Sequence, residues 1–148
     1  MTDKRPALAA MYAGLALTIL ATAVPYVDRA TGNALAEHIR AGYPSYPQER
    51  IEVAANTYLI YLSAVGVLGV IGWAVTIWAV KAGRRFAPLL AAALLAAGVT
   101  VGLFNLFVRD TSGDTGLPPM LASVGLLPCL TGVAAVTLLW TRRKEVAA

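Results

Sequence analysis

Charged side chains are scarce in this sequence, and four long stretches have none. Of the 148 residues, 14% are Asp, Glu, Lys or Arg and 58% are hydrophobic, and the mean hydropathy is +0.67. Soluble domains are usually about 25% charged and about 45–50% apolar. The uncharged stretches are 6–27, 53–80, 86–108 and 115–141. This composition excludes an ordinary soluble domain and predicts a membrane protein.

Residues that could act in catalysis, redox chemistry or ion transport are also scarce. Because no Asp, Glu, Lys, Arg or His lies in the segments expected to cross the membrane, transport coupled to a proton-carrying carboxylate is disfavoured. The single cysteine, Cys129, has no second cysteine to resolve a disulfide, which disfavours a redox role. The chain has no Ser/His/Asp or Cys/His arrangement, no glycine-rich phosphate loop and no convincing pair of catalytic carboxylates. We therefore assign no catalytic residue, no cofactor and no metal.

The uncharged stretches have the length of membrane spans. A helix needs about 20 mostly apolar residues to cross a hydrocarbon core of roughly 30 Å. We predict transmembrane helices at 7–27, 56–80, 87–108 and 119–140, with a kink at Pro128 in the fourth. The predicted fold is all-α. Residues 1–148 form a single domain, a polytopic membrane bundle of four transmembrane helices with a short amphipathic helix in the outer loop.

Basic residues predict the orientation of these helices. The N-terminus, the second connection and the C-terminus together carry eight basic residues against two acidic ones, whereas the other two loops carry four basic and six acidic residues. Lys and Arg in short loops stay on the cytoplasmic side. We expect both termini in the cytoplasm, in a plasma (inner) membrane. The basic character is then a topology signal, so that the lipid bilayer, and not nucleic acid, is the expected partner.

The first long loop, 28–55, is predicted to form a helical cap outside the membrane. Ser45 and Gln48 have the form of a capping box, with Pro47 in the first helical turn, so the second helix should begin near Pro47 and run to Ala82. Such a helix is about 54 Å long at 1.5 Å per residue, longer than the roughly 30 Å core. Its start should therefore project as a stalk.

A shorter helix is predicted before the stalk. Within 31–41, Leu35 and Ile39 lie four residues apart and form a narrow apolar stripe. Two placements remain open for this amphipathic helix: on the outer surface of the bilayer, or folded down on the stalk.

Small residues predict close packing of the spans. They recur at helical spacing in three spans and include a GxxxG motif: Ala10, Gly14, Thr18 and Thr22; Gly66, Gly69 and Gly72; Gly98 and Gly102. The GxxxG motif is compatible with either a compact bundle or a homo-oligomer. Asn105, near the outer end of the third span, is expected to form an interhelical hydrogen bond, with ligand binding as the alternative.

Candidate contact residues lie mainly in the outer loop. The residues that we single out for contact with a partner or ligand are Leu35, His38, Ile39, Glu49, Glu52 and Asn105. His38 would bind a metal only if Asp28, Glu37, Glu49 and Glu52 gathered around it, and one histidine with scattered carboxylates is a poor zinc signature. Asp110, Ser112 and Asp114 have the spacing of a calcium loop without its closing Glu, and they predict a turn.

The segment TYLIYLSAVGVLGVIGWAVTIWAVKAG, residues 57–83, lies in an Ala-rich chain that favours Arg over Lys. In these respects the chain resembles the small four-helix inner-membrane proteins of high-GC, actinobacterial-type bacteria. The resemblance covers roughly residues 31–85, has no signature residues to transfer and implies no activity.

Three function classes remain. The first is a non-enzymatic membrane protein that acts by protein contact, as an accessory, assembly or regulatory subunit with a membrane protein partner or in a homo-oligomer. The second binds or transports a lipid or a small hydrophobic molecule in an apolar cleft, which an uncharged ligand allows. The third is an enzyme at the outer membrane interface that uses His38 and nearby carboxylates.

Overall fold

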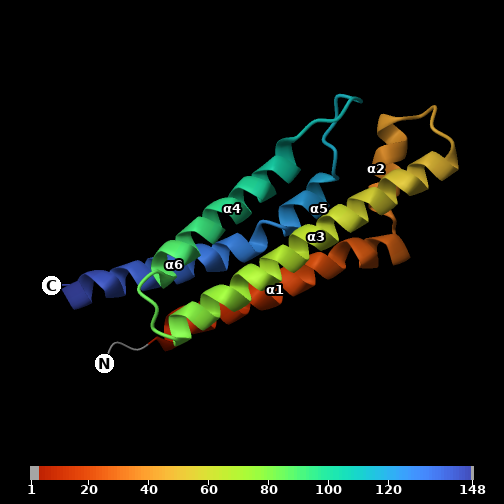
Figure 1. Ribbon diagram of the computed structural model, residues 1–148. Helices are drawn as coiled ribbons and strands as arrows, with labels where there is room; N and C mark the ends of the chain where they lie inside the picture. Colours follow the sequence, from red (N-terminus) through yellow and green to blue (C-terminus); the bar gives the residue numbers. More distant parts are fainter. Residues whose placement is uncertain (1–3, 148) are drawn as a thin grey trace.

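The computed structural model describes the backbone of residues 4–147 and the side chains of residues 4–142. Its helices are α1 (Arg5–Ala30), α2 (Ala34–Gly42), α3 (Gln48–Lys81), α4 (Ala87–Phe107), α5 (Pro119–Val124) and α6 (Leu127–Ala147) (Figure 1). The described backbone has no strand, only an isolated bridge between Arg109 and Thr115. Four segments are long and apolar enough to cross a membrane: α1, α3, α4, and α5 with α6. The predicted all-α polytopic bundle is confirmed.

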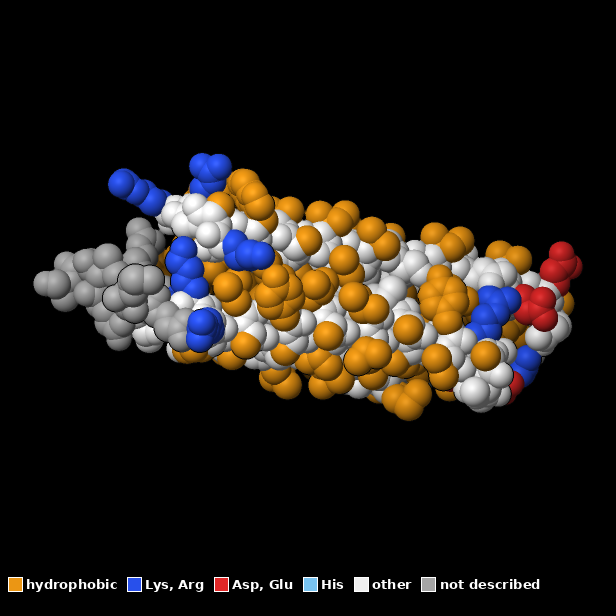
Figure 2. Space-filling model, turned by 90° about the horizontal axis from the view of Figure 1, so that it is seen from below, with side chains coloured by type: hydrophobic (Ala, Val, Ile, Leu, Met, Phe, Trp, Pro, Cys, Tyr) orange, Lys and Arg blue, Asp and Glu red, His pale blue; other side chains and the backbone are white. Residues whose placement is uncertain are grey.

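The surface of the bundle is apolar along its middle and charged at its ends. Figure 2 shows hydrophobic side chains along the central part of one face, Lys and Arg without visible Asp or Glu at one end, and Asp and Glu together with further Lys or Arg at the other. Large apolar side chains point outward, including Ile60 and Leu68, which are 71% and 68% exposed. Such a surface suits hydrocarbon and not water. We call the end with Lys4, Lys81 and Arg84 the basic end and the opposite end the cap end.

The long helix α3 begins at Gln48, close to the predicted position, but the predicted capping box is wrong. The N-cap residue is Pro47, and no side chain caps the helix. A box headed by Ser45 would require Tyr46 to be helical, and a residue before proline is driven out of the helical region. The side chain of Gln48 bonds to Arg40 and Glu52 instead.

The fourth span is broken rather than merely kinked. α5 ends at Val124, two turn residues follow, and α6 begins at Leu127. Pro128 explains the break, because its ring would clash with the carbonyl of Val124 four residues earlier and it has no N–H to donate. Local bonds close the gap: the N–H of Leu126 donates to Ser123 O and the N–H of Cys129 to Leu126 O, both at 3.0 Å.

The helices pack through their small residues, as the sequence predicts. α1 contacts both α3 and α6 extensively, whereas α4 contacts α6 and, less extensively, α3. A Cβ atom at Gly14 would lie 2.3 Å from Trp73 Cζ2, and one at Gly66 would lie 2.1 Å from Thr22 Oγ1. In the GxxxG motif of α4, a Cβ at Gly102 would lie 2.2 Å from Leu126 Cδ2. This motif therefore serves contacts within the chain.

Buried side chains form two separate clusters, one at each end. The basic-end cluster joins α1, α3, α4 and α6 through Ala7, Met11, Ile77, Ala79, Val80, Ala87, Ala91, Ala135 and Leu139. The cap-end cluster joins α2, α3, α5 and the loop before α5 through Leu35, Ala36, Ile39, Ile51, Ala55, Leu117, Leu121 and Ala122. The middle of the bundle belongs to neither cluster.

Candidate functional site

An elongated cavity of about 360 Å³ occupies the middle of the bundle. Its lining extends from Met11 to Pro25 on α1, from Leu62 to Thr76 on α3, and from Ala91 to Asn105 on α4, with further residues from α5 and α6. On each of the first three helices the lining residues reach over fourteen positions, or about 21 Å at 1.5 Å per residue. The cavity therefore follows the helix axes for most of the roughly 30 Å hydrocarbon core.

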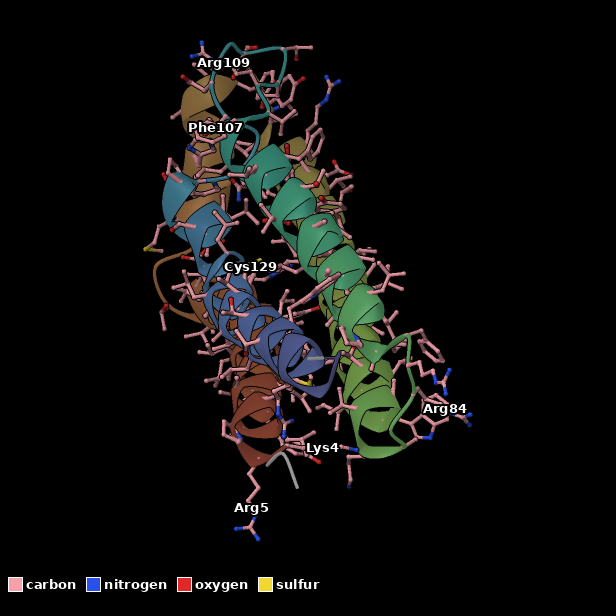
Figure 3. All side chains as sticks on the ribbon, turned by 90° about the vertical axis from the view of Figure 1, so that its left-hand side faces the viewer. Lys4, Arg5, Arg84, Phe107, Arg109 and Cys129 are labelled. Atoms are coloured by element: carbon pink, nitrogen blue, oxygen red, sulfur yellow. The ribbon has the colours of Figure 1, made fainter. Side chains whose placement is uncertain are left out.

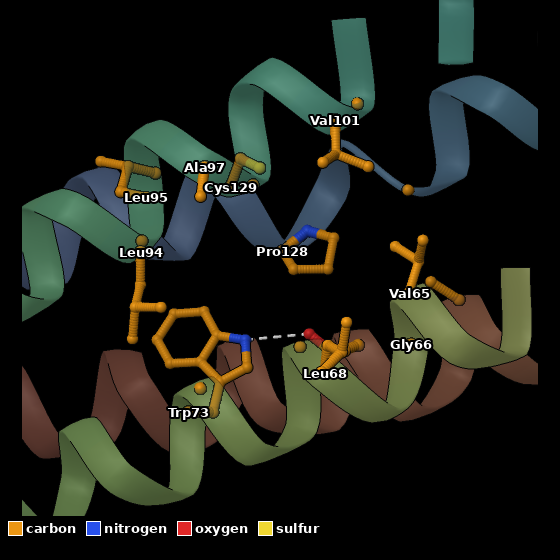
Figure 4. A pocket seen from close by; sticks show the side chains of 18 of the residues that line it. Val65, Gly66, Leu68, Trp73, Leu94, Leu95, Ala97, Val101, Pro128 and Cys129 are labelled. Atoms are coloured by element: carbon orange, nitrogen blue, oxygen red, sulfur yellow. Dashed lines mark hydrogen bonds between the residues drawn. The ribbon is translucent and has the colours of Figure 1, made fainter. Parts of the chain in front are cut away.

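The cavity opens sideways, between α3 and α4. Leu68 of α3 and Leu94 of α4 both line it, yet they are 68% and 37% exposed. Figure 4 shows Leu94 and Ala97 of α4 facing Trp73 and Leu68 of α3 across the opening, with Pro128 of α6 behind. This part of the surface lies midway along the candidate membrane spans.

The hydroxyl groups around the cavity are satisfied within the protein. Thr18 donates to Gly14 O at 2.8 Å and accepts the indole N–H of Trp73 at 2.9 Å, the bond drawn in Figure 4. Thr22 and Thr76 each donate to the carbonyl four residues earlier at 2.7 Å. Satisfied hydroxyls of this type make no demand on a ligand, so the wall acts as an apolar surface.

Asn105 is the exception at the cap end of the cavity. Its side chain is only 7% exposed, and its Oδ1 accepts the hydroxyl of Tyr61 at 2.7 Å, which is the predicted interhelical bond between α3 and α4. Among the described residues, no acceptor lies within bonding distance of its amide nitrogen, Nδ2. Asn105 lines the cavity. It thus supplies a hydrogen-bond donor without a protein acceptor to an otherwise apolar space.

The amphipathic helix α2 folds down on the stalk, which decides between its two predicted placements. Leu35 and Ile39 are 2% and 6% exposed and pack in the cap-end cluster against Ile51 of α3 and Leu121 of α5. Both were singled out as contact residues. The structure uses them for contacts within the chain.

Asp28 holds the start of α2. Its carboxylate accepts the backbone N–H groups of Ala34 at 2.9 Å and Leu35 at 3.1 Å. The turn between them has Asn33 at φ 50°, a left-handed conformation that Asn tolerates better than most residues. Asp28 therefore does the work of an N-terminal cap six residues before the helix, and sequence spacing gave no sign of this role.

His38 joins α2 to the loop before α5. Its Nε2 lies 2.6 Å from the carbonyl oxygen of Thr115, and since a carbonyl only accepts, Nε2 carries the proton. Nearby, Tyr43 and Thr111 are linked by their hydroxyls at 2.6 Å. Burial would raise the pKa of Asp110, but hydrogen bonds from Ser112 and Tyr43 and the neighbouring His38 hold that pKa below its ordinary value. The loop with Asp110 forms a turn, as predicted.

The remaining candidates do not assemble into a site with His38. Glu49 and Glu52 are exposed on α3, and Glu37 pairs with Arg40 on α2. Across residues 4–142, no three His, Cys, Asp or Glu side chains come together in a way that could hold a metal ion.

The fold and its cavity define the class: this is a multi-pass helical membrane protein with an apolar cavity between its helices. Comparison with protein-family models, with curated proteins and with solved structures finds no match for this chain. The sequence predicted the small residues that bring the helices together, but not the space left between them.

Proposed function

We propose that this protein binds one apolar molecule, a lipid chain or a small hydrophobic compound, in the cavity between α3 and α4. The observation that carries the proposal is an elongated apolar cavity that opens to the bilayer. At about 360 Å³ it falls within the size range of small-molecule pockets, about 300–1,000 Å³.

The chemistry of the wall supports an uncharged occupant taken up from the bilayer. The lining contains no Asp, Glu, Lys, Arg or His, and burying a charge there without a partner would be costly. A molecule already dissolved in the bilayer reaches the cavity without crossing water. Any charged head group would remain outside, at the membrane surface.

For the setting, we propose the plasma (inner) membrane of a bacterium, with the basic end in the cytoplasm. Lys4, Arg5 and Arg84 lie at one end of the bundle (Figure 3), and Lys81 and Arg85 belong to the same connection as Arg84; this clustering supports the orientation. The resemblance to small inner-membrane proteins of high-GC bacteria supports the setting. The helical cap then lies outside the cell.

The test is native mass spectrometry on protein released gently from its own membrane, with a matched pair of variants. Ala97→Phe places a ring in the cavity, whereas Ala96→Phe adds the same ring to an exposed position that does not line it. We expect a discrete lipid-sized adduct on the wild type and on Ala96→Phe, and about tenfold lower occupancy on Ala97→Phe, which corresponds to about 1.4 kcal/mol. A wild type without such an adduct, or an equal adduct on both variants, would overturn the proposal.

A second candidate is action by protein contact at the cap end, as an accessory or regulatory subunit. It is favoured by an exposed polar face on the stalk that α2 leaves uncovered, with Glu49 and Glu52 next to Val53, which is 60% exposed. Charge reversal at Glu49 and Glu52 should then leave the bundle folded and weaken co-purification of a stoichiometric second protein in the same native spectra. Unchanged co-purification would argue against this function.

A further inference from the structure

The amide nitrogen of Asn105 tells more about the occupant than the apolar wall does. Asn105 is 7% exposed and its amide nitrogen has no acceptor among the described residues, yet the nitrogen itself is not fully buried, so a ligand atom can reach it. In the structure the oxygen of the same amide accepts the hydroxyl of Tyr61 at 2.7 Å. The nitrogen is the other branch of that amide, on a residue that lines the cavity.

The depth of Asn105 in the bilayer adds a second observation. It lies two residues before the end of α4, at the cap end of a cavity that extends about 21 Å toward Ala91. Tyrosines gather at the same level, as expected near the boundary between hydrocarbon and head groups: Tyr61 bonds to Asn105, and the hydroxyls of Tyr26 and Ser63 are linked. In ester lipids, the ester carbonyl lies at this boundary and the acyl chain runs inward from it.

We propose that the occupant is an acyl ester lipid from the leaflet at the cap end, with its ester carbonyl accepting a hydrogen bond from Asn105 Nδ2. The acyl chain then follows the apolar lining from Asn105 toward Trp73 and Ala91. This inference rests on the proposed binding function and narrows it to one ligand class and one leaflet. An apolar molecule without an acceptor would fill the same space and leave Nδ2 unsatisfied.

Trp73 supplies the reporter for the test, because it lines the cavity. The sequence has three tryptophans, and replacing Trp78 and Trp140 by Phe leaves Trp73 as the sole fluorophore. Two brominated quenchers of similar length are then compared in detergent: the methyl ester of dibromostearic acid and dibromooctadecane. They differ mainly in the ester group. A phosphatidylcholine with dibromostearoyl chains, in nanodiscs, distinguishes a membrane phospholipid from a free single-chain ester as the source.

We expect saturable quenching of Trp73 by both small probes, with the ester binding about tenfold more tightly, a difference of about 1.4 kcal/mol. Asn105→Leu should bind the two probes equally, and Tyr61→Phe, which keeps the amide donor, should retain the preference for the ester. The two ester probes identify the source of the ligand. Quenching by both the phospholipid and the methyl ester would support a membrane phospholipid, whereas quenching by the methyl ester but not by the phospholipid would support a single-chain ester. Both results support the role of Asn105.

One result would overturn the role of Asn105, and a different result would overturn the binding function of the cavity. Equal binding of the ester and the hydrocarbon to the wild type would overturn the role of Asn105 and leave the cavity as a binding site. Absence of saturable quenching of the wild type by either probe would overturn the binding function itself. Both readings come from protein with native Asn105, so they hold even if Asn105→Leu fails to fold.

Discussion

Asp28 fixes the start of α2 by accepting two backbone N–H groups at once. The side chain is 9% exposed, and its carboxylate also faces the positive end of the helix dipole. Loss of a helix cap costs about 0.5–2 kcal/mol. We expect Asp28→Ala to lower the free energy of unfolding by about 1–2 kcal/mol, measured by thermal unfolding in detergent, and to speed amide hydrogen exchange within α2.

Asp28→Asn is the matched control for this change. It retains one acceptor oxygen at the same position but loses the second acceptor and the negative charge, so its unfolding midpoint should fall between those of the wild type and Asp28→Ala. If Asp28→Ala unfolds at the wild-type temperature and hydrogen exchange within α2 is unaltered, the start of α2 does not depend on this carboxylate.

The helical cap is held on the stalk by a different force from the one that holds the spans together. α3 is 34 residues long, about 51 Å, which exceeds the roughly 30 Å core, so part of its length lies outside the hydrocarbon. There, water drives burial of apolar side chains. Within the bilayer that force is absent, and close contacts such as Gly14 with Trp73 take its place.

This difference predicts that one substitution on α3 lowers the free energy of unfolding strongly and that another, two positions later, lowers it only slightly. Ile51 is 1% exposed in the cap-end cluster, and Val53, two positions later on the same helix, is 60% exposed. Ile51→Ala should lower the free energy of unfolding by about 2–4 kcal/mol, whereas Val53→Ala should change it by less than about 0.5 kcal/mol. Denaturation of the two variants in detergent gives the comparison. Equal small effects would show that the cap-end cluster contributes little.

The same difference explains what could be predicted from the sequence. Beside water, Leu35 and Ile39 stand out from polar neighbours, so their burial followed from their spacing. Within α4 almost every residue is apolar, so no periodicity separates Ala97, which lines the cavity, from Leu103, which is 43% exposed. An apolar cleft was one of the expectations, but its position and its lining residues could therefore not be predicted. The hydrogen bonds from the start of α2 to Asp28 could not be predicted either, because they depend on the fold of the intervening turn.

The two ends of the bundle differ in charge, and contacts in the structure bring the basic segments together. Lys4 Nζ donates to the carbonyl of Val80 at 3.2 Å, which ties the N-terminal segment to the C-terminal end of α3. This end also carries Arg84, whose guanidinium lies 5.3 Å from the ring centre of Trp78 (Figure 3). The structure thus places Lys4 and the connection with Arg84, whose charge should decide orientation, at the same end of the bundle.

Orientation can be tested by labelling one introduced cysteine on each side. In a Cys129→Ala background, Ser45→Cys places a thiol in the helical cap and Ala82→Cys places one at the basic end, and both positions are exposed. Because Lys and Arg are retained in the cytoplasm, a membrane-impermeant maleimide added to intact cells should label Ser45→Cys and spare Ala82→Cys. Permeabilised cells provide the control, since both variants should then react. Labelling of Ala82→Cys alone in intact cells would reverse the proposed orientation and place the ester-binding end of the cavity in the cytoplasmic leaflet.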